Sequence, residues 1–138
     1  MSKKQLYLDK VEANELKGED IIFVVEVMEE LSHINDDIKE ILLDLCDANE
    51  NFKINFIVGS HRAFLKIENG ILTTGKRLID DPVVTIKMDE KDALDMLLGK
   101  TTLMNMYKDH KLNVEGNLMK VAGLALMLNI VMDELGIM

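Results

Sequence analysis

The stretch that decides the fold runs from residue 52 to residue 75 and reads FKINFIVGSHRAFLKIENGILTTG. Its apolar side chains recur at every second position, first at Phe52, Ile54, Phe56 and Val58 and again at Ala63, Leu65 and Ile67. This period predicts β-strands with one buried face and one solvent-exposed face. Asn69-Gly70 is a strong hairpin signal, because a type I′ turn needs positive φ at both of its central positions. Residues 71–76 are predicted to continue as the return strand.

Two further strands are predicted beyond this stretch. Residues 84–88 alternate between apolar and polar side chains after a loop that ends at Pro82, and residues 112–115 repeat the pattern over a shorter length. We expect the first four strands to pair in sequence order as an antiparallel meander.

Helices are predicted on both sides of the strands. Asn35 can cap a helix whose apolar stripe is Ile38, Ile41, Leu42 and Leu45. Asp20 can cap an earlier helix over residues 21–31; its β-branched start leaves a strand open, whereas the later glutamates favour the helix. After the strands, an Asp89/Asp92 capping pair begins a helix that Gly99 ends, and Thr101 or Thr102 caps a short one. A last helix runs from about Asn117 to Leu135, with Gly136 as its stop.

Composition indicates one domain over residues 1–138, with a mass of 15.7 kDa. The net charge of −9 lies wholly within residues 1–52, which hold 14 acidic and 5 basic side chains. This excess argues against a nucleic-acid partner and against docking on anionic lipid. The most apolar stretch, residues 118–132, is too short and too polar for stable membrane insertion. A single cysteine and the lack of a signal peptide favour a cytoplasmic protein.

No group of residues predicts catalysis, a metal site or a cofactor. Cys46 lies between Asp44 and Asp47, which would raise the pKa of its thiol, so a structural role is favoured. The histidines are far apart in the sequence and show no ligand spacing; they are His33, His61 and His110. We therefore expect a protein that is not an enzyme.

The last helix is the unusual feature of the sequence. Residues 121–128 read VAGLALML, and the polar residues around them form no stripe along the helix. Since a surface helix normally has such a stripe, protein, partner, ligand or lipid must cover this one on every side. Seven of the ten methionines lie between residues 88 and 132; they either fill gaps in an ordinary core or adapt an apolar site to varied shapes.

Several motifs, in this order, resemble the type-2 sterol carrier protein family. They are the hairpin segments FKINFIVG and RAFLKIENG, the strand DPVVTI at residues 81–86, ALDMLLG at residues 93–99, and HKLNVEGN at residues 110–117 before the apolar closing helix. His110 and Asn117 depart from the family's usual Gly and Asp. The resemblance implies an α+β fold with a five-stranded mixed, mostly antiparallel sheet. It also implies helices packed on one face, an apolar tunnel between the layers and no catalytic residues.

The leading hypothesis is non-catalytic binding or transfer of an apolar ligand such as a fatty acyl, sterol or isoprenoid lipid in this tunnel. The candidate lining residues are Leu97, Leu103, Met104, Met106, Met119, Gly123, Met127 and Val131. The alternative is a non-catalytic interaction or dimerisation module, in which the apolar C-terminal helix packs on a second copy, as a homodimer, or on a partner.

Overall fold

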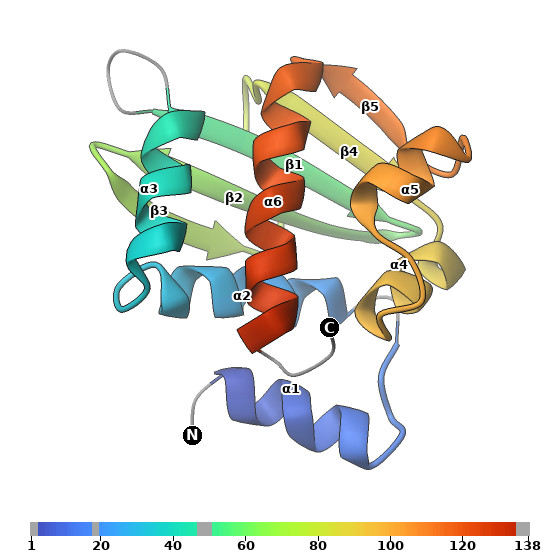
Figure 1. Cartoon of the computed structure of the whole chain (residues 1–138). Coiled ribbons are helices and arrows are strands. Elements are labelled where there is room, and N and C mark those ends of the chain that lie inside the picture. Colours follow the sequence, from blue (N-terminus) through green and yellow to red (C-terminus); the bar gives the residue numbers. More distant parts are fainter. Residues whose placement is uncertain (1–2, 18–19, 47–50, 135–138) are drawn as a thin grey trace.

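A computed structural model describes residues 3–17, 20–46 and 51–134. It shows an α+β fold, as the sequence predicts (Figure 1). The helices are α1 (Lys3–Glu12), α2 (Ile21–Leu31), α3 (Asp36–Leu45), α4 (Glu90–Leu97), α5 (Leu103–Lys108) and α6 (Leu118–Glu134). The strands are β1 (Phe52–Val58), β2 (His61–Glu68), β3 (Ile71–Gly75), β4 (Val84–Met88) and β5 (Asn113–Gly116). The predicted stop of the last helix at Gly136 lies outside the described residues.

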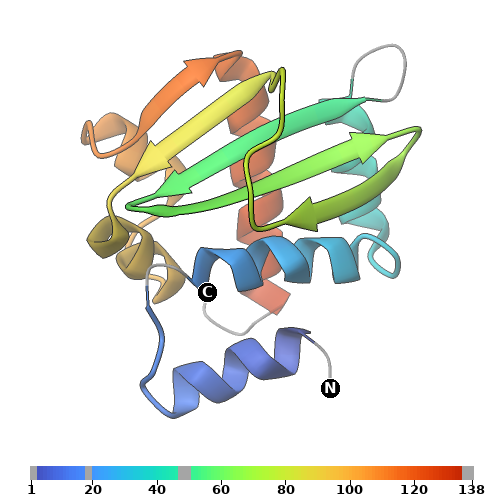
Figure 2. The same ribbon diagram turned by 180° about the vertical axis from the view of Figure 1, so that it is seen from behind.

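The five strands form one mixed sheet in the order β3-β2-β1-β4-β5. The pair β1–β4 is parallel and the other three pairs are antiparallel. The expected antiparallel meander is therefore wrong at its fourth strand, which does not follow β3. The connection from β3 instead crosses the back of the sheet (Figure 2). The Asn55 side-chain amide holds it there, exchanging two 2.9 Å hydrogen bonds with the backbone of Ile79.

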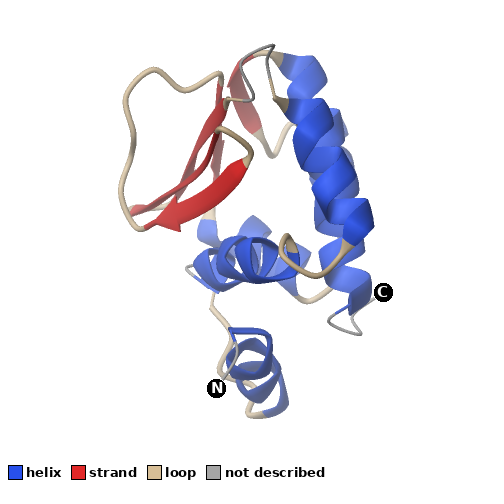
Figure 3. Ribbon diagram, turned by 90° about the vertical axis from the view of Figure 1, so that its left-hand side faces the viewer, coloured by secondary structure: helices blue, strands red, loops and turns tan. Residues whose placement is uncertain are grey.

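The helices cover one face of the sheet and leave the other face open (Figures 2 and 3). The alternation in β1 directs Phe52, Ile54 and Phe56 into the core, where all three are buried. Phe64 lies on the opposite, open face. Its register partner Asn55 is on the same face, where its side-chain amide holds the crossing loop. The Arg77 guanidinium lies 4.9 Å from the centre of the Phe64 ring and shields it from water.

Several local predictions are confirmed. Asn69 and Gly70 have φ values of 52° and 78°, as a type I′ turn requires. The Asn35 side chain accepts a hydrogen bond from the Ile38 amide, and the Thr102 side chain accepts one from the Asn105 amide. Gly99 follows α4 with a φ of 77°. Asp89, by contrast, stands at the start of α4 without a side-chain capping bond.

Helix α1 is attached to the rest of the domain through buried polar contacts. The Tyr7 hydroxyl donates a 2.7 Å hydrogen bond to the Leu97 carbonyl oxygen at the end of α4. The buried Asp20 carboxylate accepts from Lys10 Nζ at 2.8 Å and from the Lys17 amide at 2.7 Å, which is why it does not cap α2 with its side chain. Burial first, and the Asp20 carboxylate second, raise the pKa of the Tyr7 phenol above its usual range.

Candidate functional site

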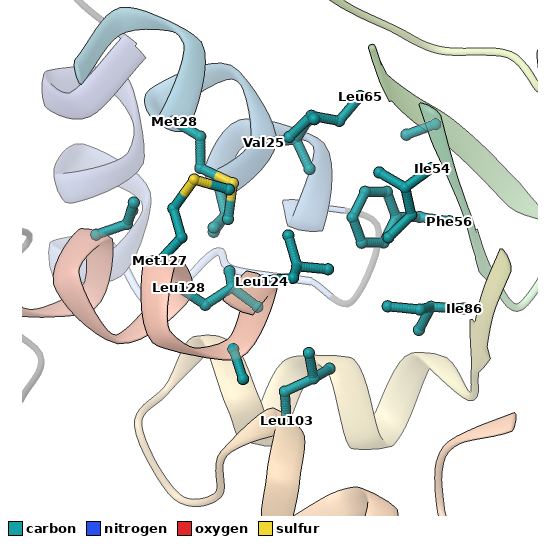
Figure 4. Close-up of a cluster of buried hydrophobic side chains, with 14 of the residues drawn as sticks. Val25, Met28, Ile54, Phe56, Leu65, Ile86, Leu103, Leu124, Met127 and Leu128 are labelled. Atoms are coloured by element: carbon teal, nitrogen blue, oxygen red, sulfur yellow. The ribbon is translucent and has the colours of Figure 1, made fainter. Parts of the chain in front are cut away.

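The inner side of α6 is the centre of the hydrophobic core. Its buried side chains are Val121, Leu124, Ala125, Met127, Leu128, Val131 and Met132. Figure 4 shows Leu124 directed toward the sheet residues Phe56 and Ile86, while Met127 points to Met28 of α2. Helix α6 thus joins the sheet to the other helices.

The outer side of α6 is exposed, although it is also apolar. Met119, Leu126 and Leu118 are 85%, 53% and 46% exposed, respectively. The expectation that this helix is covered on every side is therefore not met by the described chain alone.

The lining residues predicted from the sequence fall into two groups. Five of them are buried in the core: Leu97, Leu103, Met106, Met127 and Val131. Met104 is partly exposed on α5, and Met119 and Gly123 lie together on the outer side of α6. The structure does not bring all eight into one cavity. Leu103 borders a small space of about 30 Å³ with Leu128 and other residues of α4 and α6.

A larger apolar cavity lies at the other end of the domain, between α3 and the β2–β3 hairpin. Its volume is about 240 Å³. We call it the hairpin cavity; its lining residues are Ser32, His33, Lys39, Leu42, Leu43, Ile67, Gly70, Ile71 and Leu72. Five of the nine are aliphatic, whereas the polar ones come from the α2–α3 turn and from Lys39 of α3. This distribution suits a ligand with an apolar body and one polar end.

A second apolar recess, the α3–α6 groove, has a volume of about 370 Å³. It is lined by Ile41, Asp44, Leu45, Asn117, Met119, Lys120, Gly123 and Leu126. Gly123 allows the two helices to approach closely here, because a Cβ at this position would lie 2.7 Å from Leu45 Cδ2. The groove is larger and more open to solvent than the hairpin cavity.

The histidines and the cysteine lie far from one another in the chain. His33 lies in the α2–α3 turn, His110 precedes β5, and His61 Nε2 lies 3.2 Å from Glu90 Oε1. The Cys46 thiol donates to the Leu42 carbonyl oxygen at 3.1 Å. Among the described residues, no three His, Cys, Asp or Glu side chains are grouped so that they could hold a metal ion. In the same part of the chain, no helix combines the length and apolar content of a membrane span.

Sequence reasoning did not identify the hairpin cavity. Ile67 belongs to the alternating pattern of β2 and Leu42 belongs to the apolar stripe of α3, so both look like ordinary core residues. The available signal was Ile71, which directly follows the Asn69-Gly70 turn. A large aliphatic residue beside an exposed turn needs cover, and here it remains largely exposed at the edge of the cavity.

Comparison with known proteins identifies the family. The profile of the alkyl sulfatase C-terminal family matches residues 46–134, which is more than half of the chain. The protein therefore belongs to the alkyl sulfatase C-terminal family. The match begins at the end of α3 and covers the whole sheet and all of the helices that follow.

Solved structures show the same fold. A UbiJ-SCP2 ubiquinone synthesis protein is 12% identical, with a TM-score of 0.59 over 76% of this chain and 89% of that one. Sterol carrier protein domain 2 of Helicoverpa armigera is 14% identical, with a TM-score of 0.54 over 82% and 87%. The predicted resemblance to sterol carrier proteins is thus confirmed at the level of the fold.

The chain is far shorter than one of the proteins that it matches. The sec-alkylsulfatase Pisa1 from Pseudomonas sp. is 19% identical, with a TM-score of 0.48 over 66% of this chain. This chain spans only 14% of the length of that enzyme. No curated protein matches the sequence.

Proposed function

We propose that this domain binds an apolar small molecule, such as a fatty acyl, sterol or isoprenoid lipid, without transforming it. The observation that supports this function is the hairpin cavity, in which aliphatic side chains surround about 240 Å³. Desolvation of an alkyl chain there would contribute roughly 25 cal/mol for each Å² of apolar surface buried. The fold, shared with sterol carrier protein domains, supports the same function.

The polar groups at the cavity suit a ligand that is apolar along most of its length. Lys39 is exposed on α3, and His33 is exposed in the adjacent turn. Either can meet a polar end of the ligand while Leu42 and Leu72, both buried, contact its apolar body. A few polar groups beside an apolar interior are typical of a site that orients a ligand.

The hairpin cavity has room for only a short alkyl segment. One water molecule takes up about 30 Å³ in the liquid, so the cavity volume of about 240 Å³ corresponds to about eight water molecules. A longer ligand would extend beyond it. We keep the eight residues named from the sequence as the proposed path of that extension, with Met127 as the position to test. The dispersal of Cys46 and the histidines supports binding rather than catalysis.

The proposal is tested by titrating the delipidated protein with a fluorescent fatty acid, and with sterol and polyprenyl probes. We expect saturable binding at micromolar concentration, which corresponds to about −8 kcal/mol. Native mass spectrometry of the unheated protein would show any lipid that is retained. The proposal is wrong if none of the three probes saturates.

The location of the site is tested with two matched variants. Leu43→Arg places a charge beside the cavity at a residue that is 56% exposed, so the fold should survive. Leu98→Arg makes the same change at a partly exposed leucine that follows α4. We expect the first variant to weaken probe binding at least tenfold, as roughly 1.4 kcal/mol would, and the second to leave it unchanged. Equal losses of probe affinity in the two variants would mean that the ligand does not bind in the hairpin cavity.

A further inference from the structure

The open face of the sheet carries charges of mainly one sign. In β1, β2 and β4 every second residue points to this face, because the residues between them belong to the core on the helical side. The charged side chains at the outward positions of these three strands are Lys53, Arg62, Lys66, Lys87 and Glu68. Glu68, the acidic one, lies at the end of β2, where its Oε1 is 3.5 Å from Lys66 Nζ. The edge strand β5 adds a second acidic residue, Glu115. The outward face of the sheet is therefore basic on balance.

The register of the strands brings like charges together on this face. Lys53 and Lys66 are direct partners across β1 and β2. Arg62 and Lys87 are the two partners of Ile57, so these residues form one row across β2, β1 and β4. Like charges close together on one face of a sheet are unfavourable. Within the described part of the chain, Lys53, Arg62 and Lys87 form no ion pair that would compensate them.

The connection from β3 to β4 adds apolar groups to the same face. It crosses the open side and stands out from the sheet (Figures 2 and 3). Leu78 is half-buried in this crossing loop, and Val83 at its end is 39% exposed. The charges of the loop are mixed, since Arg77 lies over the open face whereas Asp80 and Asp81 are exposed. The open face thus combines basic strands with a partly apolar ridge.

We propose that the open face of the sheet docks on an anionic lipid bilayer. Lysine and arginine side chains close to an anionic leaflet are attracted to it, and apolar side chains beside them gain from burial at the interface. The choice of a bilayer as the occupant rests on the proposed function, since a lipid ligand would be exchanged with a membrane. The contact uses none of the residues that line the hairpin cavity.

The negative net charge of the chain opposes this contact only weakly at physiological salt. The excess of −9 belongs to residues 1–52, whose helices α2 and α3 pack on the other face of the sheet. At about 0.15 M salt the Debye length is about 8 Å, so charges beyond the sheet are largely screened from a surface on its open side. The total charge therefore argues against anionic lipid, whereas the placement of the charges favours one oriented contact.

The first experiment is co-sedimentation of the full chain with phosphatidylcholine vesicles, with and without about one-third phosphatidylserine. We expect binding to the anionic vesicles alone, and its loss in 1 M salt, where the Debye length is about 3 Å. Lys87→Glu reverses an exposed charge on the open face and should weaken vesicle binding about tenfold. Lys100→Glu makes the same change of net charge at an exposed residue between α4 and α5, and should leave binding within about twofold of the wild type.

The second experiment changes the charge of the same face in the opposite direction. Asp81→Asn removes an acidic group of the crossing loop and should strengthen vesicle binding several-fold; asparagine tolerates the φ of 55° at this position. Asp109→Asn, at the exposed end of α5, is the matched control and should have no such effect. Circular dichroism confirms that each variant is folded.

Three results would overturn the proposal: no binding of the wild type to anionic vesicles, equal binding to both kinds of vesicle, or equal losses in Lys87→Glu and Lys100→Glu. The titration with lipid probes is done without vesicles and is independent of this contact. A chain that saturates with a probe but ignores the vesicles would therefore overturn membrane docking and leave the proposed ligand binding in place.

Discussion

Helices α3 and α6 lie side by side on the same face of the sheet, yet their sequences specify their surroundings very differently (Figure 1). Helix α3 has a capping residue, Asn35, two acidic residues in its first turn and one buried stripe. Helix α6 is apolar on its inner and outer sides and carries its charges against its dipole. In α3 the pattern states which side meets water, whereas in α6 it does not.

The difference shows what periodicity can and cannot assign. A polar outer side makes the burial of α3 readable from spacing alone. For α6, the neighbouring elements determine which side is buried. The sheet and α2 cover one side, and the described chain leaves the other side exposed. An uncovered apolar side is the feature that carries information about a partner.

The largest expected effect compares two methionines on opposite sides of α6. If Met127 is a closely packed core residue, Met127→Ala should lower the free energy of unfolding by about 2–5 kcal/mol, because it leaves a cavity beside Met28. Met119→Ala removes a side chain that is 85% exposed and should change that free energy by less than about 0.5 kcal/mol. Urea denaturation of the lipid-free protein measures both.

The same pair also tests the proposed path of a long ligand. If Met127 borders open space, its truncation creates little new cavity and should cost only about 1 kcal/mol, with a larger loss of probe affinity. A large loss of stability with unchanged affinity would make Met127 a core residue and remove it from the proposed site.

The next effect concerns the contact between the two helices. Gly123→Leu should destabilise the fold by about 1–3 kcal/mol, since the added side chain meets Leu45 and forces α3 and α6 apart. Ala122→Leu makes a comparable enlargement at the adjacent, exposed position and should stay within about 0.5 kcal/mol of the wild type. Similar values for both would mean that Gly123 does not determine the spacing of the helices.

Most of the fold could be predicted from local signals. Alternation located four of the strands, and the Asn69-Gly70 turn located the return strand β3. This turn and the caps at Asn35 and Thr102 have the expected geometry. The parallel pairing of β1 with β4 could not be predicted, because it depends on a long-range bond. Asn55 looks like any polar residue of a strand until its amide is seen to hold the backbone of Ile79.

The candidate site was less predictable than the fold. Composition indicated an apolar function, but it directed attention to the methionine-rich second half of the chain. The hairpin cavity instead combines Leu43 of α3 with Ile71 of β3, two residues that are far apart in the sequence. A cavity between such segments is a property of packing, and no spacing within either segment encodes it.

Helix α1, in contrast to α3 and α6, is attached to the domain partly through one buried hydrogen bond, from the Tyr7 hydroxyl to the Leu97 carbonyl oxygen. Tyr7→Phe should cost about 1 kcal/mol at neutral pH, because the Leu97 carbonyl loses its donor. Since folding raises the pKa of this phenol above its ordinary value of 10.0, its contribution is complete below pH 10 and declines as the pH rises further.

The measurement is the difference in urea midpoint between the wild type and Tyr7→Phe from pH 7 to pH 11. This difference should shrink above pH 10. Tyr107→Phe, at an exposed tyrosine of α5, is the control and should show no comparable change. A midpoint difference that stays constant from pH 7 to pH 11 would mean that ionisation of Tyr7 does not affect the stability of the protein.

The smallest expected change in stability comes from the charged residues in the first turns of α3 and α6. Lys120→Glu should stabilise the chain by about 0.3–1 kcal/mol, because an acidic group in the first turn of α6 suits the helix dipole. Asp37→Lys makes the reverse change in the first turn of α3 and should destabilise the chain by a similar amount. Both shifts should diminish in 1 M salt, where the Debye length is about 3 Å. A loss of stability for Lys120→Glu would mean that Lys120 already has a favourable environment within the chain, such as the Asp44 carboxylate that lines the same groove.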